Sequence, residues 1–141
     1  MNKIVIDANI VFFAVLSQSS YTREVFQGLL DEDVDILAPY FIYGEVLNVF
    51  LRLTEQRWLT YDFHKAKIQR ILELIDVVDY DFYADVIEKV KPEVNQIDPK
   101  DLDYVALAYK LWAPLWSNDK RLKKLKSIKV LTTQDLLEAK A

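Results

Sequence analysis

The stretch Lys3-Ile4-Val5-Ile6-Asp7-Ala8-Asn9 decides the fold class, because it joins an apolar β-branched run directly to polar residues. A short run without polar alternation is typical of a strand buried on both faces, as in a parallel sheet. Open parallel sheets bind their ligands beyond the carboxyl ends of the strands. Asp7 is therefore expected at such an end, where its carboxylate can take part in a functional site.

Outward from this stretch, strands and helices alternate along the chain. Strands are predicted at residues 3–6, 35–38, 77–78, 114–116 and 129–131. Helices are predicted at residues 22–30, 40–53, 60–75, 81–90, 101–112 and 133–140. Thr60 and Asp81 are the expected caps of their helices, Pro92 is expected beyond a helix end, and residues 93–100 are expected to form a polar loop. Such alternation predicts an α/β fold, a three-layer α/β/α sandwich around a mainly parallel sheet.

The composition describes a chain that can bury a full core. Its 141 residues are 52% hydrophobic, with two glycines and four prolines, which fits one domain over residues 1–141. The sequence contains no cysteine, so a disulfide framework and a thiolate metal site are excluded. Asp7 and Asn9 interrupt the first apolar stretch, and no small-x-small cleavage site follows it. We expect a cytoplasmic protein without a membrane span.

The charge balance is acidic, with a net charge of −4 and a pI near 5.0. Proteins that only bind nucleic acid are usually basic, so this balance by itself counts against a polyanionic partner. The balance is less surprising if several acids are clustered around a metal ion, because bound cations cancel that local charge.

Four acidic residues stand where the predicted fold brings them toward one edge of the sheet. Asp7 directly follows the first strand, and Asp119 comes three residues after Trp116. Asp101 opens a predicted helix, and Glu45 lies one turn inside another, beside its apolar stripe. Two unit charges about 4 Å apart repel by about 4 kcal/mol at an effective dielectric of about 20, so such a cluster needs protons or cations.

The ligand type indicates the chemistry of such a cluster. Carboxylate oxygens suit Mg²⁺ or Mn²⁺, and Mg²⁺ commonly completes its shell with water and phosphate oxygens. A metal-bound water can act as a nucleophile, and the metal can stabilise the leaving oxygen. Four acids without a cysteine therefore favour phosphodiester hydrolysis over redox or thiol chemistry.

Four segments carry these acids in a fixed order. Ile4 to Asn9 contains the first, Pro39 to Val46 the second, Asp101 to Ala108 the third and Ala113 to Asp119 the fourth. In this order and spacing the segments resemble the four motifs of the PIN-domain family. The resemblance spans residue 3 to about residue 131, and it includes toxin ribonucleases of the VapC type and related stand-alone proteins.

The resemblance implies a nuclease that uses one or two Mg²⁺ or Mn²⁺ ions to cut RNA. Asp7 and Asp101 would be the central metal ligands, and Glu45 would ligate metal or orient the attacking water. Asp119 would hold a second metal or act through water. The supporting residues would be Asn9, Ser117 and Asn118. Homodimers are typical of the family, and a toxin would need an antitoxin that offers an Arg or Lys to the carboxylates.

The third acid has three candidates within six residues, Asp98, Asp101 and Asp103. Asp101 is preferred because it shares a helix face with Val105 and Ala108 and has the expected interval to the fourth motif. Asp103 lies about 200° away on an ideal helix and should face elsewhere. Asp98 precedes the helix and is retained as a second-tier ligand from the loop.

Each acid also has an ordinary structural explanation. Asp7 can cap the helix that follows it, and Glu45 can be an exposed first-turn glutamate favoured by the helix dipole. Asp101 can be the N-cap of its own helix, and Asp119 can belong to a polar turn. A single metal site explains all four acids together.

Basic residues near the acids are candidate contacts to RNA phosphates. They are Arg52, Lys120, Arg121, Lys123 and Lys124. The run that begins at Lys120 can equally be a solvated surface with its leucines turned inward. His64 is expected on the surface, which argues against histidine-based acid–base chemistry.

The aromatic residues have two competing explanations. Trp58, Trp112 and Trp116 can stack on bases, but core or subunit contacts are the more usual role of such residues. A dimer face is expected around Phe12, Phe13, Leu47, Tyr61 and Phe63.

Two other functions stay open. The first is a phosphotransferase or phosphatase with Asp7 as nucleophile, although that chemistry usually needs a second aspartate where Asn9 stands. The second is a non-catalytic PIN-like binding module, for which the loss of one of the four acids would be the sequence sign.

Overall fold

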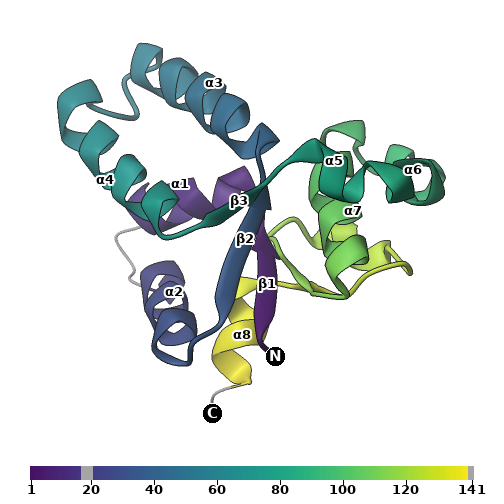
Figure 1. The fold of residues 1–141 in the computed structure, drawn as a ribbon. Helices are drawn as coiled ribbons and strands as arrows, with labels where there is room; N and C mark the ends of the chain where they lie inside the picture. The colour runs from purple at the N-terminus through teal and green to yellow at the C-terminus, as the bar shows by residue number, and fades with distance from the viewer. Residues whose placement is uncertain (17–20, 140–141) are drawn as a thin grey trace.

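The computed structural model describes residues 1–16 and 21–139 (Figure 1). Its sheet has five short strands, all parallel, in the order β3-β2-β1-β4-β5. The strands are β1 Lys3–Ile6, β2 Asp35–Pro39, β3 Asp76–Val78, β4 Leu115–Trp116 and β5 Val130–Leu131. Each coincides with a predicted strand to within one residue or so, and the predicted α/β fold is confirmed.

Eight α-helices are present in the described part of the chain, with three short 3-10 helices between them. The α-helices are α1 Ala8–Leu16, α2 Tyr21–Asp31, α3 Phe41–Glu55, α4 Tyr61–Glu73, α5 Tyr80–Tyr83, α6 Ile87–Asn95, α7 Leu102–Leu111 and α8 Thr133–Glu138. The 3-10 helices are η1 Ala84–Val86, η2 Pro99–Asp101 and η3 Lys120–Lys124. No helix in the described ranges combines the length and apolar character that crossing a membrane requires.

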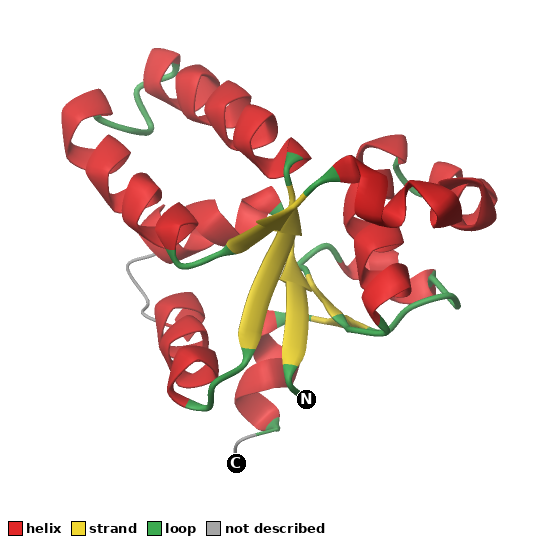
Figure 2. Ribbon diagram, viewed as in Figure 1, coloured by secondary structure: helices red, strands yellow, loops and turns green. Residues whose placement is uncertain are grey.

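The helices cover both faces of the sheet and give it three layers (Figure 2). On one face, α1 packs against α2 and α4, while α2 packs against β2 and α8. On the other face, α7 lies against β1, β2 and β4, with α5 and α6 packed on its outer side. Helices α3 and α4 follow each other as a hairpin, and both contact α1.

The strand order reverses between β1 and β4, and this switch point positions the candidate site. Ile6 lies beside Trp116 in the parallel register, and both are fully buried. The next residue on each strand, Asp7 on β1 and Ser117 on β4, therefore leaves the sheet at the same edge. That edge is the carboxyl end of the strands, where open α/β sheets bind their ligands.

Helix α1 is missing from the sequence prediction, which began its first helix only at residue 22. Residues 10–16 are uniformly apolar, so they show no 3.6-residue periodicity that distinguishes a helix from a strand. The structure buries α1 between α2, α3 and α4, which explains why nearly all of its sides are apolar.

The prediction around Pro92 is wrong in detail. The expected single helix at residues 81–90 is divided into α5, η1 and α6, with Asp79 rather than Asp81 at the N-cap position. Pro92 lies inside α6, so part of the expected 93–100 loop is helical as well. Glu88 and Pro92 are both exposed, and water can therefore take the hydrogen bond that the proline cannot donate to the Glu88 carbonyl.

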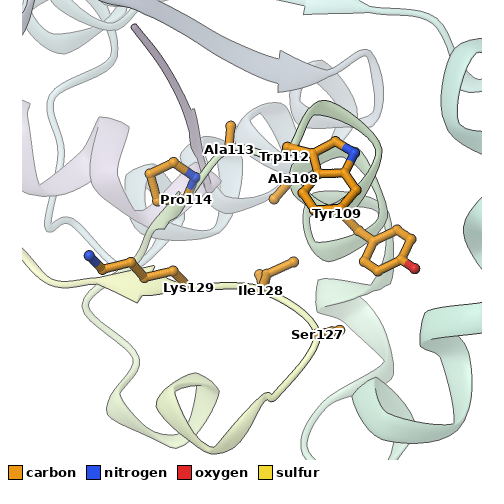
Figure 3. A pocket seen from close by; sticks show the side chains of 8 residues that line it. All are labelled: Ala108, Tyr109, Trp112, Ala113, Pro114, Ser127, Ile128 and Lys129. Atoms are coloured by element: carbon orange, nitrogen blue, oxygen red, sulfur yellow. The ribbon is translucent and has the colours of Figure 1, made fainter. Parts of the chain in front are cut away.

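A pocket of about 250 Å³ opens at the amino-terminal ends of β4 and β5 (Figure 3). Asp7 follows the carboxyl-terminal end of the parallel strand β1 and so lies at the opposite end of the sheet. Trp112 stands at its rim with 96% of its surface exposed. Trp112 also ends α7 in the left-handed conformation, with φ 56° and ψ 35°, which a bulky side chain adopts only with strain.

We expect Trp112→Gly to stabilise the protein by about 1 kcal/mol, because glycine relieves the left-handed strain while little buried contact is lost. Chemical denaturation of the two proteins measures the difference. Trp112→Ala is the matched control, since it removes the ring but keeps the strain, and it should give no such gain. Equal stability of the glycine and alanine variants would contradict this explanation.

Candidate active site

Asp7 is a buried carboxylate at the switch point, with only 5% of its surface exposed. Its Oδ1 accepts a hydrogen bond from the Ile10 backbone N–H at 3.2 Å, so it does cap α1. The Ser117 side chain, brought alongside by the register of β1 and β4, also hydrogen-bonds to it. Burial outweighs these hydrogen bonds and raises the pKa of Asp7 to about 6.

Asp101 couples electrostatically to every other acid of the site. It occupies the N-cap position of α7, yet its side chain makes no capping hydrogen bond. Burial raises the pKa of Asp101 to about 7, and negative charges add to the effect. Those charges belong, in decreasing order of effect, to Asp7, Asp98, Asp119 and Glu45. The structure therefore brings together all four predicted acids, with Asp98 beside them.

Glu45 lies in the second turn of α3 and faces α7. Its Oε1 accepts a hydrogen bond from the Tyr104 hydroxyl at 2.8 Å. Partial burial raises the pKa of Glu45, while the Tyr104 hydrogen bond and the Lys100 charge oppose the rise. Burial and the Glu45 charge in turn raise the pKa of Tyr104 well above its usual range, so its hydroxyl remains a donor.

Tyr104 and Lys100 are site residues that sequence reasoning missed. Tyr104 is three residues after Asp101, on the same face of α7, and it is fully buried. That spacing beside a preferred acid was a usable signal, because a tyrosine buried under a carboxylate usually donates to it. Lys100 is exposed and carries no pattern that separates it from other surface lysines.

Tyr104→Phe is expected to lower about tenfold the RNA cleavage that the PIN-domain resemblance implies, because Glu45 loses the donor that orients it and holds down its pKa. The measured pH profile of cleavage should shift upward, since the pKa of Glu45 rises when the hydrogen bond is lost. Tyr109→Phe, which alters a partly exposed tyrosine of the same helix, is the control. A rate loss without any change in the pH profile would show that Tyr104 only packs.

Asp119 is held by Arg121 in a chelating ion pair. The guanidinium Nη2 lies 2.7 Å from Oδ2, and Nε lies 3.0 Å from Oδ1 and 3.2 Å from Oδ2. The Arg121 backbone N–H also donates to Oδ1 at 3.0 Å, which caps η3. These hydrogen bonds lower the pKa of Asp119. Asp119 thus has the turn role expected of it as well as a place beside Asp101.

The three candidates for the third acid are separated by their partners. Asp103 accepts a hydrogen bond from the Tyr83 hydroxyl at 2.5 Å, on the side of α7 that faces α5. Asp98 caps η2 through the Lys100 backbone N–H, and its Oδ2 lies 3.7 Å from Arg121 Nη2. Asp101 makes no capping bond, which favours it as the central ligand of the three.

The carboxylates have the donor chemistry that a divalent cation prefers, but their present spacing is too wide to hold one. Across residues 1–16 and 21–139, no three acidic, histidine or cysteine side chains stand close enough to hold a metal ion as they are. All the donors are nevertheless hard carboxylate oxygens, and four other negative groups oppose the charge of Asp101. A divalent cation would relieve that repulsion. Asp7, Asp101 and Glu45 would hold it, with Asp119 available once it leaves Arg121.

The predicted supporting residues have different environments. Ser117 is fully buried, hydrogen-bonds to Asp7 and accepts from the Asp119 backbone N–H at 3.2 Å. Asn118 accepts from the Thr133 backbone N–H at 2.8 Å and so fixes the start of α8. Asn9 is exposed in the first turn of α1. In the described part of the chain, Ser117 is therefore the one of the three whose side chain contacts a predicted metal ligand.

Arg52 and Asn9 line one apolar groove between α1 and α3, of about 560 Å³. The other lining residues are Phe12, Phe13, Leu16, Val49 and Leu53. The groove is lined by the helix segments that follow two of the acids, since Asn9 comes two residues after Asp7 and Arg52 comes seven residues after Glu45. Arg52 is exposed and offers this groove a cation.

The basic run at η3 has the character of a solvated surface with its leucines turned inward, and its contact with RNA stays a prediction. Leu122 and Leu125 are buried, so the run is anchored to the core as an ordinary amphipathic surface would be. Lys120, Lys123 and Lys124 are exposed, and Lys123 Nζ lies 2.5 Å from Asp135 Oδ2 in α8. Among these cations, Arg121 is the one that contacts the predicted site acids.

The tryptophans and the histidine differ sharply in exposure. Trp116 is fully buried, and its indole N–H donates to Thr133 Oγ1 at 3.0 Å, so it is a core residue. Trp58 is 71% exposed on the turn after α3. His64 is partly buried, in α4, and its Nδ1 accepts a hydrogen bond from the Thr60 backbone N–H at 2.9 Å. None of the three contacts an acid of the site in the described structure.

Comparisons with known proteins agree with the fold. Residues 5–140 match the family model described as PIN domain. No curated protein matches the chain in sequence.

Several solved structures superpose on the chain at low identity. VapBC2 from Rickettsia felis, bound to a DNA fragment from their promoter, aligns with a TM-score of 0.73 and 15% identity, over 92% of this chain and 98% of that one. DNA-bound VapBC from Salmonella typhimurium aligns with a TM-score of 0.73 and 16% identity, over 94% of this chain and 99% of that one. FitAcB from Neisseria gonorrhoeae aligns with a TM-score of 0.72 and 18% identity, over 93% of this chain and 98% of that one.

These structures share the fold over almost the whole length of both chains, and the family model matches from β1 to the end of α8. The chain belongs to the PIN-domain family.

Proposed function

We propose that the protein is a metal-dependent endoribonuclease, formed by one domain over residues 1–141, that hydrolyses phosphodiester bonds of RNA with one or two Mg²⁺ or Mn²⁺ ions. The observation that carries the proposal is the electrostatic coupling of Asp101 to Asp7, Asp98, Asp119 and Glu45 at the switch point. Such a concentration of negative charge repels an anionic phosphodiester, so a substrate of this kind can bind there only when cations neutralise the acids.

The environment of each site residue suggests a different role in the proposed reaction. Asp7 and Asp101, the two most strongly desolvated acids, would hold the metal, and Ser117 would orient Asp7. A bound Mg²⁺ or Mn²⁺ supplies charge neutralisation and a more acidic water. Glu45, with its raised pKa and the Tyr104 hydrogen bond, is suited to orient the attacking water and take its proton.

The groove that joins Asn9 to Arg52 is the proposed path for the RNA strand. Its exposed aromatic and apolar lining suits unstacked bases, and Arg52 would contact a phosphate. Lys120, Arg121, Lys123 and Lys124 would contact phosphates on the other side of the acids. A single strand fits such a groove better than a duplex, because its bases are free to stack.

The proposal extends to partners by analogy with the structural relatives. They include VapBC structures and a toxin–antitoxin complex from Klebsiella pneumoniae. We infer that this chain acts as the toxin of such a pair in the cytoplasm, as a homodimer, and that an antitoxin inhibits it by presenting a cation to the acids. Exposed Phe13, Leu47, Tyr61 and Phe63 supply apolar surface for these contacts.

The test is cleavage of a labelled single-stranded RNA, with matching DNA and RNA duplex as comparison substrates. Cleavage of the RNA with Mg²⁺ or Mn²⁺, its loss with EDTA and its loss in Asp7→Asn would support the proposal. Metal-independent cleavage, or full activity in Asp7→Asn, would overturn the site. A stable phosphate adduct on Asp7 would indicate a phosphotransferase, and tight RNA binding without cleavage would indicate a binding module.

A further inference from the structure

Arg121 occupies both oxygens of the Asp119 carboxylate at once. Nη2 lies 2.7 Å from Oδ2, while Nε lies 3.0 Å from Oδ1 and 3.2 Å from Oδ2. The Arg121 backbone N–H takes Oδ1 as well. Three N–H groups of Arg121 make four contacts with the two oxygens, so the in-plane lone pairs of Asp119 are largely committed and little of the carboxylate remains for a cation.

The backbone conformation at the start of η3 places Asp119 and Arg121 in position to form this ion pair. Asp119 is the N-cap of η3, and Arg121 follows it by two residues, so the capping bond already holds backbone and carboxylate together. Leu122 and Leu125 are buried and anchor η3 to the core. With η3 fixed in this way, the guanidinium lies over the acids, where Nη2 also comes within 3.7 Å of Asp98 Oδ2.

The guanidinium is not needed to hold η3 in place. The backbone cap and the two buried leucines supply that anchorage, and 59% of the Arg121 side chain remains exposed. An exposed ion pair stabilises a fold weakly. Lys123, on the same helix, pairs with Asp135 instead of with an acid of the site, so a cation on η3 does not have to contact these acids. The position of Arg121 therefore has its main consequence at the site rather than in the fold.

We propose that Arg121 is a built-in counter-cation that competes with a metal ion for Asp119, so that metal binding at this acid requires the guanidinium to leave. The inference rests on the proposed metal-dependent function. In the metal-free protein, Arg121 offsets part of the repulsion among Asp119, Asp98 and Asp101, which lie within its field. When a divalent ion takes Asp119, the same guanidinium is released toward the solvent at the edge of the site.

The test is the affinity of the metal-free protein for Mn²⁺ alone, measured by isothermal titration calorimetry. Competition predicts that Arg121→Ala binds Mn²⁺ about fivefold tighter than the parent, which is the equivalent of about 1 kcal/mol. Arg121→Lys should lie between the two, because an ammonium keeps the charge but cannot chelate both oxygens. Lys120→Ala removes the same charge one residue away and should change the affinity by less than about twofold.

Each alternative gives a different set of affinities. Equal affinity of Arg121→Ala and the parent would overturn the proposal, and weaker binding by Arg121→Ala would show that Arg121 instead supports the metal site. If Arg121→Ala and Lys120→Ala bound Mn²⁺ with similarly increased affinity, while Arg121→Lys kept the parent's affinity, the effect would come from the overall charge alone. That result would also overturn the proposal. Absence of Mn²⁺ binding in both the parent and Arg121→Ala would refute the proposed metal-dependent function itself, whereas Mn²⁺ binding that appears only in Arg121→Ala would show complete occlusion by Arg121.

Discussion

Asp101→Asn is expected to reduce metal-dependent RNA cleavage at least about a hundredfold while stabilising the metal-free protein. Asp101 is the acid on which the charges of the other four converge, so an amide there removes a central ligand and the repulsion together. The amide has nearly the same shape, and no capping hydrogen bond depends on the carboxylate. We expect the stability of the metal-free variant to rise by about 1–2 kcal/mol at about pH 8.

Asp103→Asn is the matched control for this substitution. It makes the same chemical change two residues along, but Asp103 bonds to Tyr83 rather than to the site acids, and an amide oxygen can still accept that hydrogen bond. Cleavage by Asp103→Asn should stay within about threefold of the parent, since its charge acts on Glu45 only through space. Near-parental cleavage by Asp101→Asn, or a loss as large in Asp103→Asn, would contradict the assignment of the third acid.

The second expected result is that the metal-free protein loses stability as the pH rises from about 4 to about 7, and that Mn²⁺ reverses this trend. Burial raises the pKa of Asp7 to about 6 and of Asp101 to about 7. The folded protein then binds these protons more tightly than the unfolded chain does, so ionisation in this window favours unfolding. The lowered pKa values of Asp119 and Asp135 have the opposite sign and act at lower pH.

A metal ion binds the ionised acids, so its stabilising effect grows as protons leave. At a free concentration about a hundred times its dissociation constant, a ligand stabilises the folded state by about 2.7 kcal/mol. Thermal denaturation at about pH 5 and about pH 8, with EDTA or with Mn²⁺, measures both effects. Asp101→Asn should flatten the pH trend in EDTA. A metal-free protein that becomes more stable toward pH 8 would show that these acids are compensated in another way.

The sheet could be predicted from sequence because its strands carry short, unambiguous signals. Ile4-Val5-Ile6 has no polar interruption, and an aspartate follows at once, which is the pattern of a central parallel strand with a site at its end. Helix α1 could not be separated from such a strand by its sequence, since it is buried against three other helices and lacks a polar face. Pro92 misled the prediction because an exposed helix turn tolerates the lost hydrogen bond.

The acids of the site were accessible to sequence reasoning, but their partners were less so. Asp7 and Asp101 follow from strand ends and motif spacing, and the structure brings both beside Glu45 and Asp119. The hydrogen bond from Tyr104 to Glu45 joins residues 59 positions apart, and only packing of α7 against the start of α3 determines it. The chelation of Asp119 by Arg121 depends on the turn of η3, a segment to which the sequence prediction assigned a basic surface but no helix.

The most direct test of the central claim, that these carboxylates form a metal site, is anomalous diffraction from crystals of the protein soaked in Mn²⁺. The expected result is an anomalous peak bounded by Asp7 and Asp101, with Glu45 turned toward it and the Arg121 guanidinium displaced from Asp119 if a second ion binds there. No peak at these acids in a protein that is otherwise folded, or a peak only at acids elsewhere on the surface, would contradict the claim.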